Sequence, residues 1–115
     1  MIKIYHNPRC SKSRATMKLL DEKGVAPTVI EYLETPPDAK TLDGFLKKLG
    51  MEPRDLMRKG EAPYKELNLK DESKSRGELI QAMVDNPILI ERPIVVNGNK
   101  VALGRPPENV LEILG

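Results

Sequence analysis

Cys10 is the only cysteine of the chain, and polar and basic residues surround it in the sequence. It lies in residues 6–14, HNPRCSKSR, which follow a short apolar run and precede a helical pattern. A thiol between a strand and a helix faces the positive end of the helix dipole. That field and the nearby cations both favour the thiolate, which is the nucleophilic form of cysteine. The segment therefore predicts a reactive sulfur, and its backbone N–H groups and cations predict an adjacent oxyanion pocket.

Three neighbours of Cys10 could support its thiolate, namely His6, Ser13 and Arg14. Ser13 stands where a Cys-x-x-Cys redox motif has its second thiol, so it could donate a hydrogen bond to the thiolate but could not form a disulfide. An external thiol would then have to resolve Cys10. Ser13 could equally be an ordinary first-turn serine. His6 could act as a general base, but a hydrogen bond to the loop is slightly favoured, and Arg14 adds positive charge.

Two arginines elsewhere precede prolines at the ends of expected core strands, Arg92 before Pro93 and Arg105 before Pro106. Most arginines are solvated surface charges, but these two lie at turns. Guanidinium groups bind tetrahedral oxyanions through paired hydrogen bonds. We therefore expect Arg92 and Arg105 to lie near the thiol, and the Arg92–Pro93 peptide bond is a candidate for the cis form.

The reactive segment is expected to belong to an amino-terminal βαβ unit. Apolar and β-rich patterns predict strands over residues 2–6 and 28–33. A helical pattern covers residues 11–23 and ends at Gly24. The two strands of such a unit are parallel, and the crossover is right-handed. Cys10 would then lie where the first strand passes into the helix.

Residues 35–87 are predicted to form a helical insert. Apolar residues recur with a helical period over residues 42–49. Pro53 can open a short helix over residues 53–58. Residues 75–78, with the sequence SRGE, form a capping-box pattern that starts a further helix.

The last third of the chain returns to strands. Residues 94–96 and 100–103 predict a hairpin that turns at Asn97-Gly98. A final helix is expected to open at Pro106-Pro107 and to present three apolar residues, Val110, Leu111 and Leu114. The whole order predicts an α/β protein of the thioredoxin-like fold, with a βαβ…ββα mixed sheet. We expect residues 1–115 to be one such domain with the helical insert within it.

Composition supports a small soluble domain without structural metal. The chain has 115 residues, 39% of them hydrophobic, and a net charge of +2. That length is enough to bury a core, and the balanced charge does not indicate a nucleic-acid or membrane partner. No apolar run reaches the length of a membrane span or a signal peptide. One cysteine and one histidine argue against structural zinc, and the lone cysteine suggests the reducing cytoplasm.

Five sequence blocks resemble the glutaredoxin-linked arsenate reductase family. They are YHNPRCSKSR (5–14), EYLETPP (31–37), LMRK (56–59), NPILIERPIVV (86–96) and GRP (104–106). The resemblance covers nearly the whole chain in register. It implies a thioredoxin-like fold with a helical insert and reduction of arsenate, or a similar oxyanion, to arsenite. It also implies no bound cofactor, glutathione as co-substrate and glutaredoxin as partner.

The resemblance assigns roles to individual positions. The family's catalytic cysteine, its three oxyanion-binding arginines, and its nearby histidine and serine fall on Cys10, Arg58, Arg92, Arg105, His6 and Ser13. Ser11-Lys12 replaces a Gly-Thr pair that is frequent in these reductases. This departure groups the chain with a chromosomal branch of the family.

A related branch, the Spx-type regulators, provides the alternative. On that hypothesis the chain is a non-catalytic thioredoxin-like regulator or oxyanion-binding protein. Regulators of this type bind RNA polymerase and commonly use a Cys-x-x-Cys pair as a redox switch. Ser13 removes that switch from this chain, which favours the enzyme.

Overall fold

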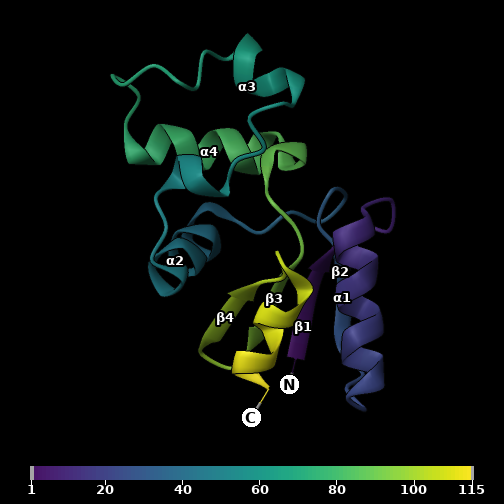
Figure 1. Ribbon diagram of the computed structural model, residues 1–115. Coiled ribbons are helices and arrows are strands. Elements are labelled where there is room, and N and C mark those ends of the chain that lie inside the picture. The colour runs from purple at the N-terminus through teal and green to yellow at the C-terminus, as the bar shows by residue number, and fades with distance from the viewer. Residues whose placement is uncertain (1, 115) are drawn as a thin grey trace. The chain divides into compact units, whose positions relative to one another are not determined.

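The computed structural model describes residues 2–114, which form two compact units (Figure 1). The first unit combines both ends of the chain, up to Thr35 and from Arg92 onward. The second unit spans Pro36–Glu91. None of the helices within residues 2–114 combines the length and the apolar character needed to cross a bilayer.

The first unit is built on a four-stranded sheet in the order β2-β1-β3-β4. Its strands are β1 (Ile2–His6), β2 (Thr28–Glu31), β3 (Ile94–Asn97) and β4 (Lys100–Leu103). β1 pairs in parallel with β2 and antiparallel with β3, and β3 and β4 form a hairpin. The helix α1 (Ser11–Glu22) connects β1 to β2, which confirms the predicted βαβ unit.

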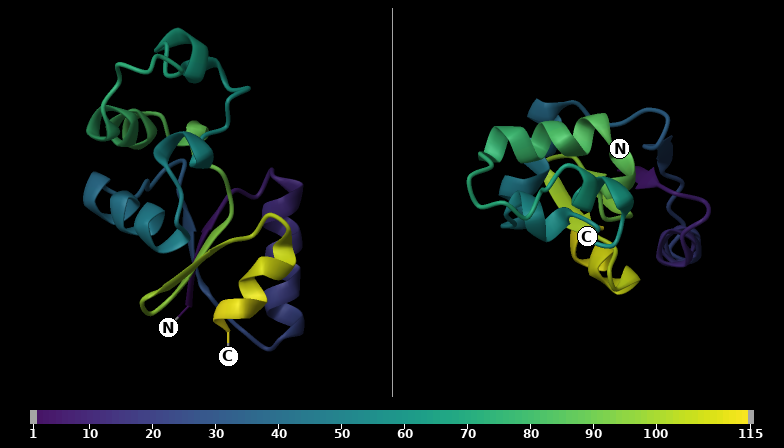
Figure 2. Two further views of the ribbon diagram at one scale, coloured as in Figure 1. Left: turned by 60° about the vertical axis from the view of Figure 1, so that its left-hand side comes forward. Right: turned by 90° about the horizontal axis from the view of Figure 1, so that it is seen from above.

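The core of this unit lies between the sheet and two helices, α1 and the 3₁₀ helix η3 (Pro107–Ile113). Figure 2 shows both helices on the same side of the sheet. The buried side chains of this core come from every layer, namely Ile4, Leu20, Val95, Ala102, Val110 and Ile113. The expected final helix is a 3₁₀ helix, which repeats every three residues and so buries Val110 and Ile113 while leaving Leu111 exposed.

Two boundaries in the first unit differ from the sequence prediction. β2 ends at Glu31, because its carbonyl accepts hydrogen bonds from the N–H groups of Glu34 and Thr35 and so closes a turn. The hairpin turns at residues 98–99, one position later than expected, because Asn97 still pairs with Lys100. Gly98 supplies the left-handed conformation of that turn, with φ of 63°.

The second unit is helical. Its elements are α2 (Ala39–Leu49), η1 (Pro53–Leu56), α3 (Ala62–Glu66), α4 (Arg76–Asp85) and η2 (Pro87–Leu89). α4 contacts α2, η1 and η2. The predicted capping box is present, since the Ser75 hydroxyl accepts from the Glu78 N–H and the Glu78 carboxylate accepts from the Ser75 N–H.

The predicted helix over residues 53–58 stops at Leu56. Met57 instead forms an antiparallel bridge with Ile90. The Arg58 N–H donates to the carbonyl of Leu89 at 2.7 Å, and the Glu91 N–H donates to that of Leu56 at 2.8 Å. These bonds between residues far apart in sequence hold Arg58 in an extended segment rather than on a helix.

Candidate active site

Cys10 occupies the junction between β1 and α1. It is the N-cap residue of α1 and has an extended backbone, with φ of −93° and ψ of 125°. Its N–H donates to the carbonyl of Asn7 at 3.0 Å, and its carbonyl accepts from the N–H of Arg14 at 3.0 Å. The side chain is partly exposed. The predicted position of an accessible thiol at a helix N-terminus is confirmed.

The environment of Cys10 favours the thiolate. Burial by itself raises the pKa of the thiol, because a charge is less well solvated there. Hydrogen bonds from the backbone N–H groups of Ser13 and Lys12 and from the Arg92 side chain lower it, and the charge of Arg92 adds to them. These interactions outweigh burial, so the pKa of Cys10 lies below that of an ordinary cysteine.

Ser13 supports the loop through its hydroxyl and the thiolate through its backbone. Its fully buried Oγ lies 2.6 Å from His6 Nδ1 and accepts a hydrogen bond from the Asn7 N–H at 3.0 Å. The hydroxyl therefore binds the loop, whereas the group of Ser13 that reaches Cys10 is its N–H. His6 has the loop-bonding contact that the sequence slightly favoured.

The charge state of His6 is set mainly by burial, which lowers its pKa. Arg14 lowers the pKa of His6 further, and Glu31 partly opposes both effects. His6 is therefore neutral at neutral pH. Arg14 donates from Nη1 to the Pro8 carbonyl at 3.0 Å, and it is not among the groups that lower the pKa of Cys10.

Arg92 is the charged partner of the thiol. Its side chain hydrogen-bonds to Cys10, and the residue is only 7% exposed. Within residues 2–114, its Nε and Nη1 atoms are buried without a hydrogen-bond partner. Buried polar groups are nearly always hydrogen-bonded, and an unpaired buried guanidinium donor is costly. A bound oxyanion beside the Cys10 sulfur would satisfy these donors.

Arg105 is attached to the same turn. Its Nη1 donates to the Arg92 carbonyl at 3.2 Å, and the neighbouring Gly104 N–H donates to the Pro93 carbonyl at 2.9 Å. The Arg92–Pro93 and Arg105–Pro106 peptide bonds are both cis, the first of them a candidate from the sequence. The end of β4 is thus fastened to the turn that carries Arg92.

Arg58 lies in the second unit. Its Nε lies 3.1 Å from Glu61 Oε2, and its Nη1 lies 3.4 Å from Glu91 Oε1. All three side chains are partly exposed. The guanidinium is therefore already engaged by two carboxylates.

Asn7 and Gly104 shape the site, and the sequence reading did not single them out. The Asn7 side chain accepts from the Arg9 N–H at 3.0 Å, which with the Cys10 contact closes the reactive loop. A Cβ atom on Gly104 would lie 2.6 Å from Thr16 Oγ1 and 2.8 Å from Pro93 Cγ. The Asn-Pro pair was a turn signal. The close approach at Gly104 had no local signal, because it joins distant segments.

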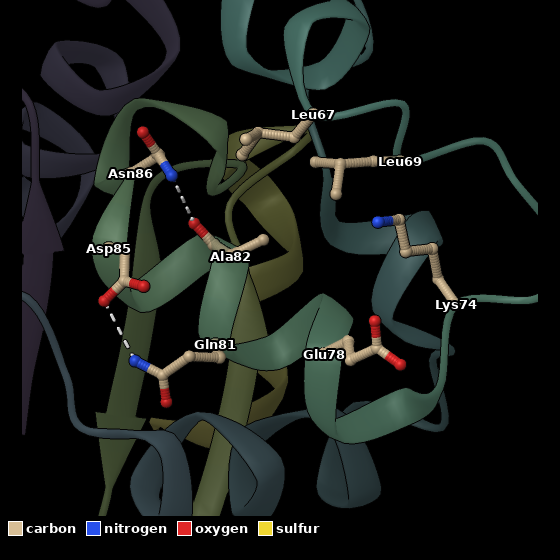
Figure 3. A pocket seen from close by; sticks show the side chains of 8 residues that line it. All are labelled: Leu67, Leu69, Lys74, Glu78, Gln81, Ala82, Asp85 and Asn86. Carbon is tan, nitrogen blue, oxygen red and sulfur yellow. Dashed lines mark hydrogen bonds between the residues drawn. The ribbon is translucent and has the colours of Figure 1, made fainter.

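The second unit also contains a pocket of about 360 Å³ (Figure 3). Leu67 and Leu69 line one side, and Glu78, Gln81 and Asp85 of α4 lie opposite them. Gln81 donates to Asp85 at 2.9 Å. None of the predicted site residues lines this pocket.

Comparison with known proteins gives matches over almost the full chain. The ArsC family matches residues 5–113. The chain is 65% identical to the uncharacterized protein YfgD of Escherichia coli K12, covering 99% of this chain and 97% of that protein. It is 48% identical to the arsenate reductase of Neisseria meningitidis serogroup A, covering 98% and 97%. The structure of an arsenate reductase from Vibrio cholerae matches with a TM-score of 0.94 and 54% identity over 98% and 97%, which confirms the predicted α/β thioredoxin-like class.

Proposed function

Since this chain belongs to the ArsC family, we propose that it reduces arsenate, or a closely similar oxyanion, to arsenite at Cys10. The observation that carries this proposal is Arg92, whose two buried donors lack partners within residues 2–114 while its side chain bonds the thiol. The nucleophilic thiol of Cys10 and a guanidinium with donors for an anion thus lie side by side. The relatives named arsenate reductase support the choice of oxyanion.

The first step uses the Cys10 thiolate as the nucleophile. Its sulfur attacks the arsenic, an S–As bond forms, and one As–O bond breaks. The departing oxygen takes up protons and leaves as water. Arg92 offers hydrogen bonds to the remaining oxygens, where charge develops, and Arg105 from the adjoining turn is the second proposed donor. Arg58 is the third donor that the family resemblance assigns.

The second step transfers the electrons. The thiolate of glutathione attacks the Cys10 sulfur, an S–S bond forms, and the S–As bonding pair remains on arsenic. Arsenic(V) becomes arsenic(III), arsenite leaves, and Cys10 is left as a mixed disulfide with glutathione. Ser13 cannot act as a resolving thiol, so glutaredoxin must free Cys10 by thiol–disulfide exchange. Glutathione and a free thiol both require a reducing compartment, so we propose that the reaction takes place in the cytoplasm.

The test is NADPH consumption in an assay that couples arsenate reduction to glutathione, glutathione reductase and glutaredoxin. We expect turnover with the native chain and none with Cys10→Ser, because a hydroxyl is a far poorer nucleophile. Arsenate binding by calorimetry should persist in Cys10→Ser, since Arg92 is unchanged. Turnover that survives in Cys10→Ser, or native protein that neither binds nor reduces arsenate, would reject the proposal.

A further inference from the structure

The charges in the first and last turns of α1 oppose its helix dipole, although Lys23 at the C-cap favours it. The first turn contains no acidic residue but carries Lys12 and Arg14. The last turn contains no basic residue and ends with Asp21 and Glu22. Helices favour the reverse arrangement, with acidic residues in the first turn and basic residues in the last. The cations near Cys10 therefore weaken the helix, and their presence calls for another reason.

Three cations form what we call the basic patch: Arg9, Arg14 and Lys18. Arg14 and Lys18 lie one turn apart on one side of α1. The hydrogen bond from Arg14 to the Pro8 carbonyl brings Arg14 to the loop that carries Arg9. All three are exposed. None of them forms an ion pair with a carboxylate of residues 2–114, and the side-chain hydrogen bond of Arg14 goes to a backbone carbonyl. The patch thus presents uncompensated positive charge to solvent from the loop before α1 and from one side of that helix, the purple helix of Figure 1.

Neither the thiolate nor the oxyanion accounts for this patch. The charges of Arg9, Arg14 and Lys18 are not among the interactions that lower the pKa of Cys10. The oxyanion is served by the buried donors of Arg92. Lys18 lies eight residues beyond Cys10, which is about 12 Å of helical rise and more than a tetrahedral ion spans. The patch therefore extends past the oxyanion site and is open to contact by a larger partner.

We propose that the basic patch is the docking surface for an acidic protein thiol, the reductant that frees Cys10 from its mixed disulfide. This inference rests on the proposed function. In the docked complex the partner's thiolate attacks the glutathione sulfur, a new S–S bond forms between partner and glutathione, and the Cys10 sulfur leaves as thiolate. Complementary charge speeds encounter and fixes orientation, and added salt weakens both effects.

The experiment starts from the full chain with Cys10 converted to its glutathione disulfide. Release of Cys10 by a bacterial glutaredoxin of net negative charge is followed by stopped flow. The variant Arg9→Glu/Lys18→Glu reverses two patch charges, and Arg9→Glu places an acid where the helix dipole favours it. Arg9→Gln/Lys18→Gln removes the same charges without reversal. Lys100→Glu is the matched control, because exposed Lys100 pairs with Asn97 at the end of the sheet remote from Cys10.

At low salt we expect the charge-reversed variant to react with the glutaredoxin about tenfold more slowly, and the neutral variant to lie in between. The difference should shrink in about 0.5 M NaCl, where charges are screened. Lys100→Glu should match the native chain, and release by the neutral thiol dithiothreitol should be the same in all four proteins.

Two results of this experiment would overturn the docking surface. They are native rates in the charge-reversed variant and an equal loss of rate with dithiothreitol. Tighter binding of duplex DNA than of the glutaredoxin would likewise reassign it. Charge-dependent release in a protein that fails to reduce arsenate would support the docking surface and reject only the proposed function.

Discussion

The thiol of Cys10 should ionise at lower pH than a free cysteine, whose pKa is about 8.5. Burial raises its pKa, but the N–H groups of Ser13 and Lys12 and the Arg92 side chain more than reverse that effect. The rate of iodoacetamide labelling against pH should therefore have its midpoint below the free-thiol value. Arg92→Met removes one of these donors and should move the midpoint upward. A native midpoint at or above that of free cysteine contradicts this account.

His6 should make the stability of the protein depend on pH. Burial, with help from Arg14, lowers its pKa in the folded state, whereas the unfolded chain has the ordinary value of about 6.5. The unfolded state then binds more protons just below that pH, so the free energy of unfolding falls as pH drops from about 6.5 toward the folded pKa. Urea denaturation across this range should show the fall in the native chain. His6→Asn should lack it, and identical profiles would exclude the effect.

Replacement of Arg92 by lysine should lower activity although it keeps the positive charge. A guanidinium offers several donors in a fixed plane, whereas an ammonium is a point charge that cannot bond both the sulfur and an oxyanion in the same geometry. Loss of a charge-assisted hydrogen bond costs about 1–3 kcal/mol, so kcat/KM for arsenate should fall roughly 5- to 150-fold in Arg92→Lys. Arg76→Lys is the control, because Arg76 pairs with Asp43 on the surface of the second unit. Equal activities of the two variants would contradict the role of Arg92.

At the scale of elements, Gly104 determines how closely β4 approaches α1 and the Arg92–Pro93 turn. An added methyl would meet Thr16 Oγ1, which is held by its bond to the Lys12 carbonyl at 2.9 Å, and the rigid ring of Pro93. Gly104→Ala should cost about 1–3 kcal/mol in the free energy of unfolding by urea. Gly44→Ala, in α2 with no atom within 4 Å of the added carbon, should be neutral or gain up to about 1 kcal/mol.

A second variant separates the two contacts of Gly104. Thr16→Ala/Gly104→Ala removes the hydroxyl that the new methyl would meet and leaves the Pro93 ring in place. The double variant should therefore recover part of the lost stability relative to the sum of the single variants. Full additivity would show that Thr16 is not the obstacle.

Elements whose signals are local could be predicted from the sequence. The capping box at Ser75 and the parallel strands around α1 formed as expected, since turn chemistry and hydrophobic period act over a few residues. Two elements could not be predicted in this way. The segment after Leu56 is extended because Met57 pairs with Ile90, far along the chain, and η3 tightened into a 3₁₀ helix against the core. In both cases tertiary contacts overrode local preference.

At the scale of the whole molecule, features of the candidate site that have local sequence signals could be predicted, and those that depend on distant segments could not. The position of Cys10 at a helix N-terminus and the approach of Arg92 to it were predictable, because a lone thiol in a basic loop and an arginine before a strand-edge proline are unusual in themselves. The pairing of Arg58 with Glu91 was not predictable, since Glu91 is distant in sequence. The boundary between the two units falls between Glu91, which binds Arg58, and Arg92, which binds the thiol. Adjacent residues of one segment thus engage an arginine of one unit and the nucleophile of the other.

The two carboxylates that pair with Arg58 give a prediction about its role in substrate binding. If Arg58 binds substrate, the oxyanion must compete with Glu61 and Glu91 for its guanidinium. Partly exposed ion pairs contribute up to about 1 kcal/mol each, so removing both carboxylate charges should tighten binding by at most roughly 5-fold per carboxylate. We expect Glu61→Gln/Glu91→Gln, in the Cys10→Ser background that prevents turnover, to bind arsenate more tightly by calorimetry. Arg58→Gln should weaken binding and abolish that gain. A gain that persists without Arg58 would show that the carboxylates act on the oxyanion by general repulsion rather than through this arginine.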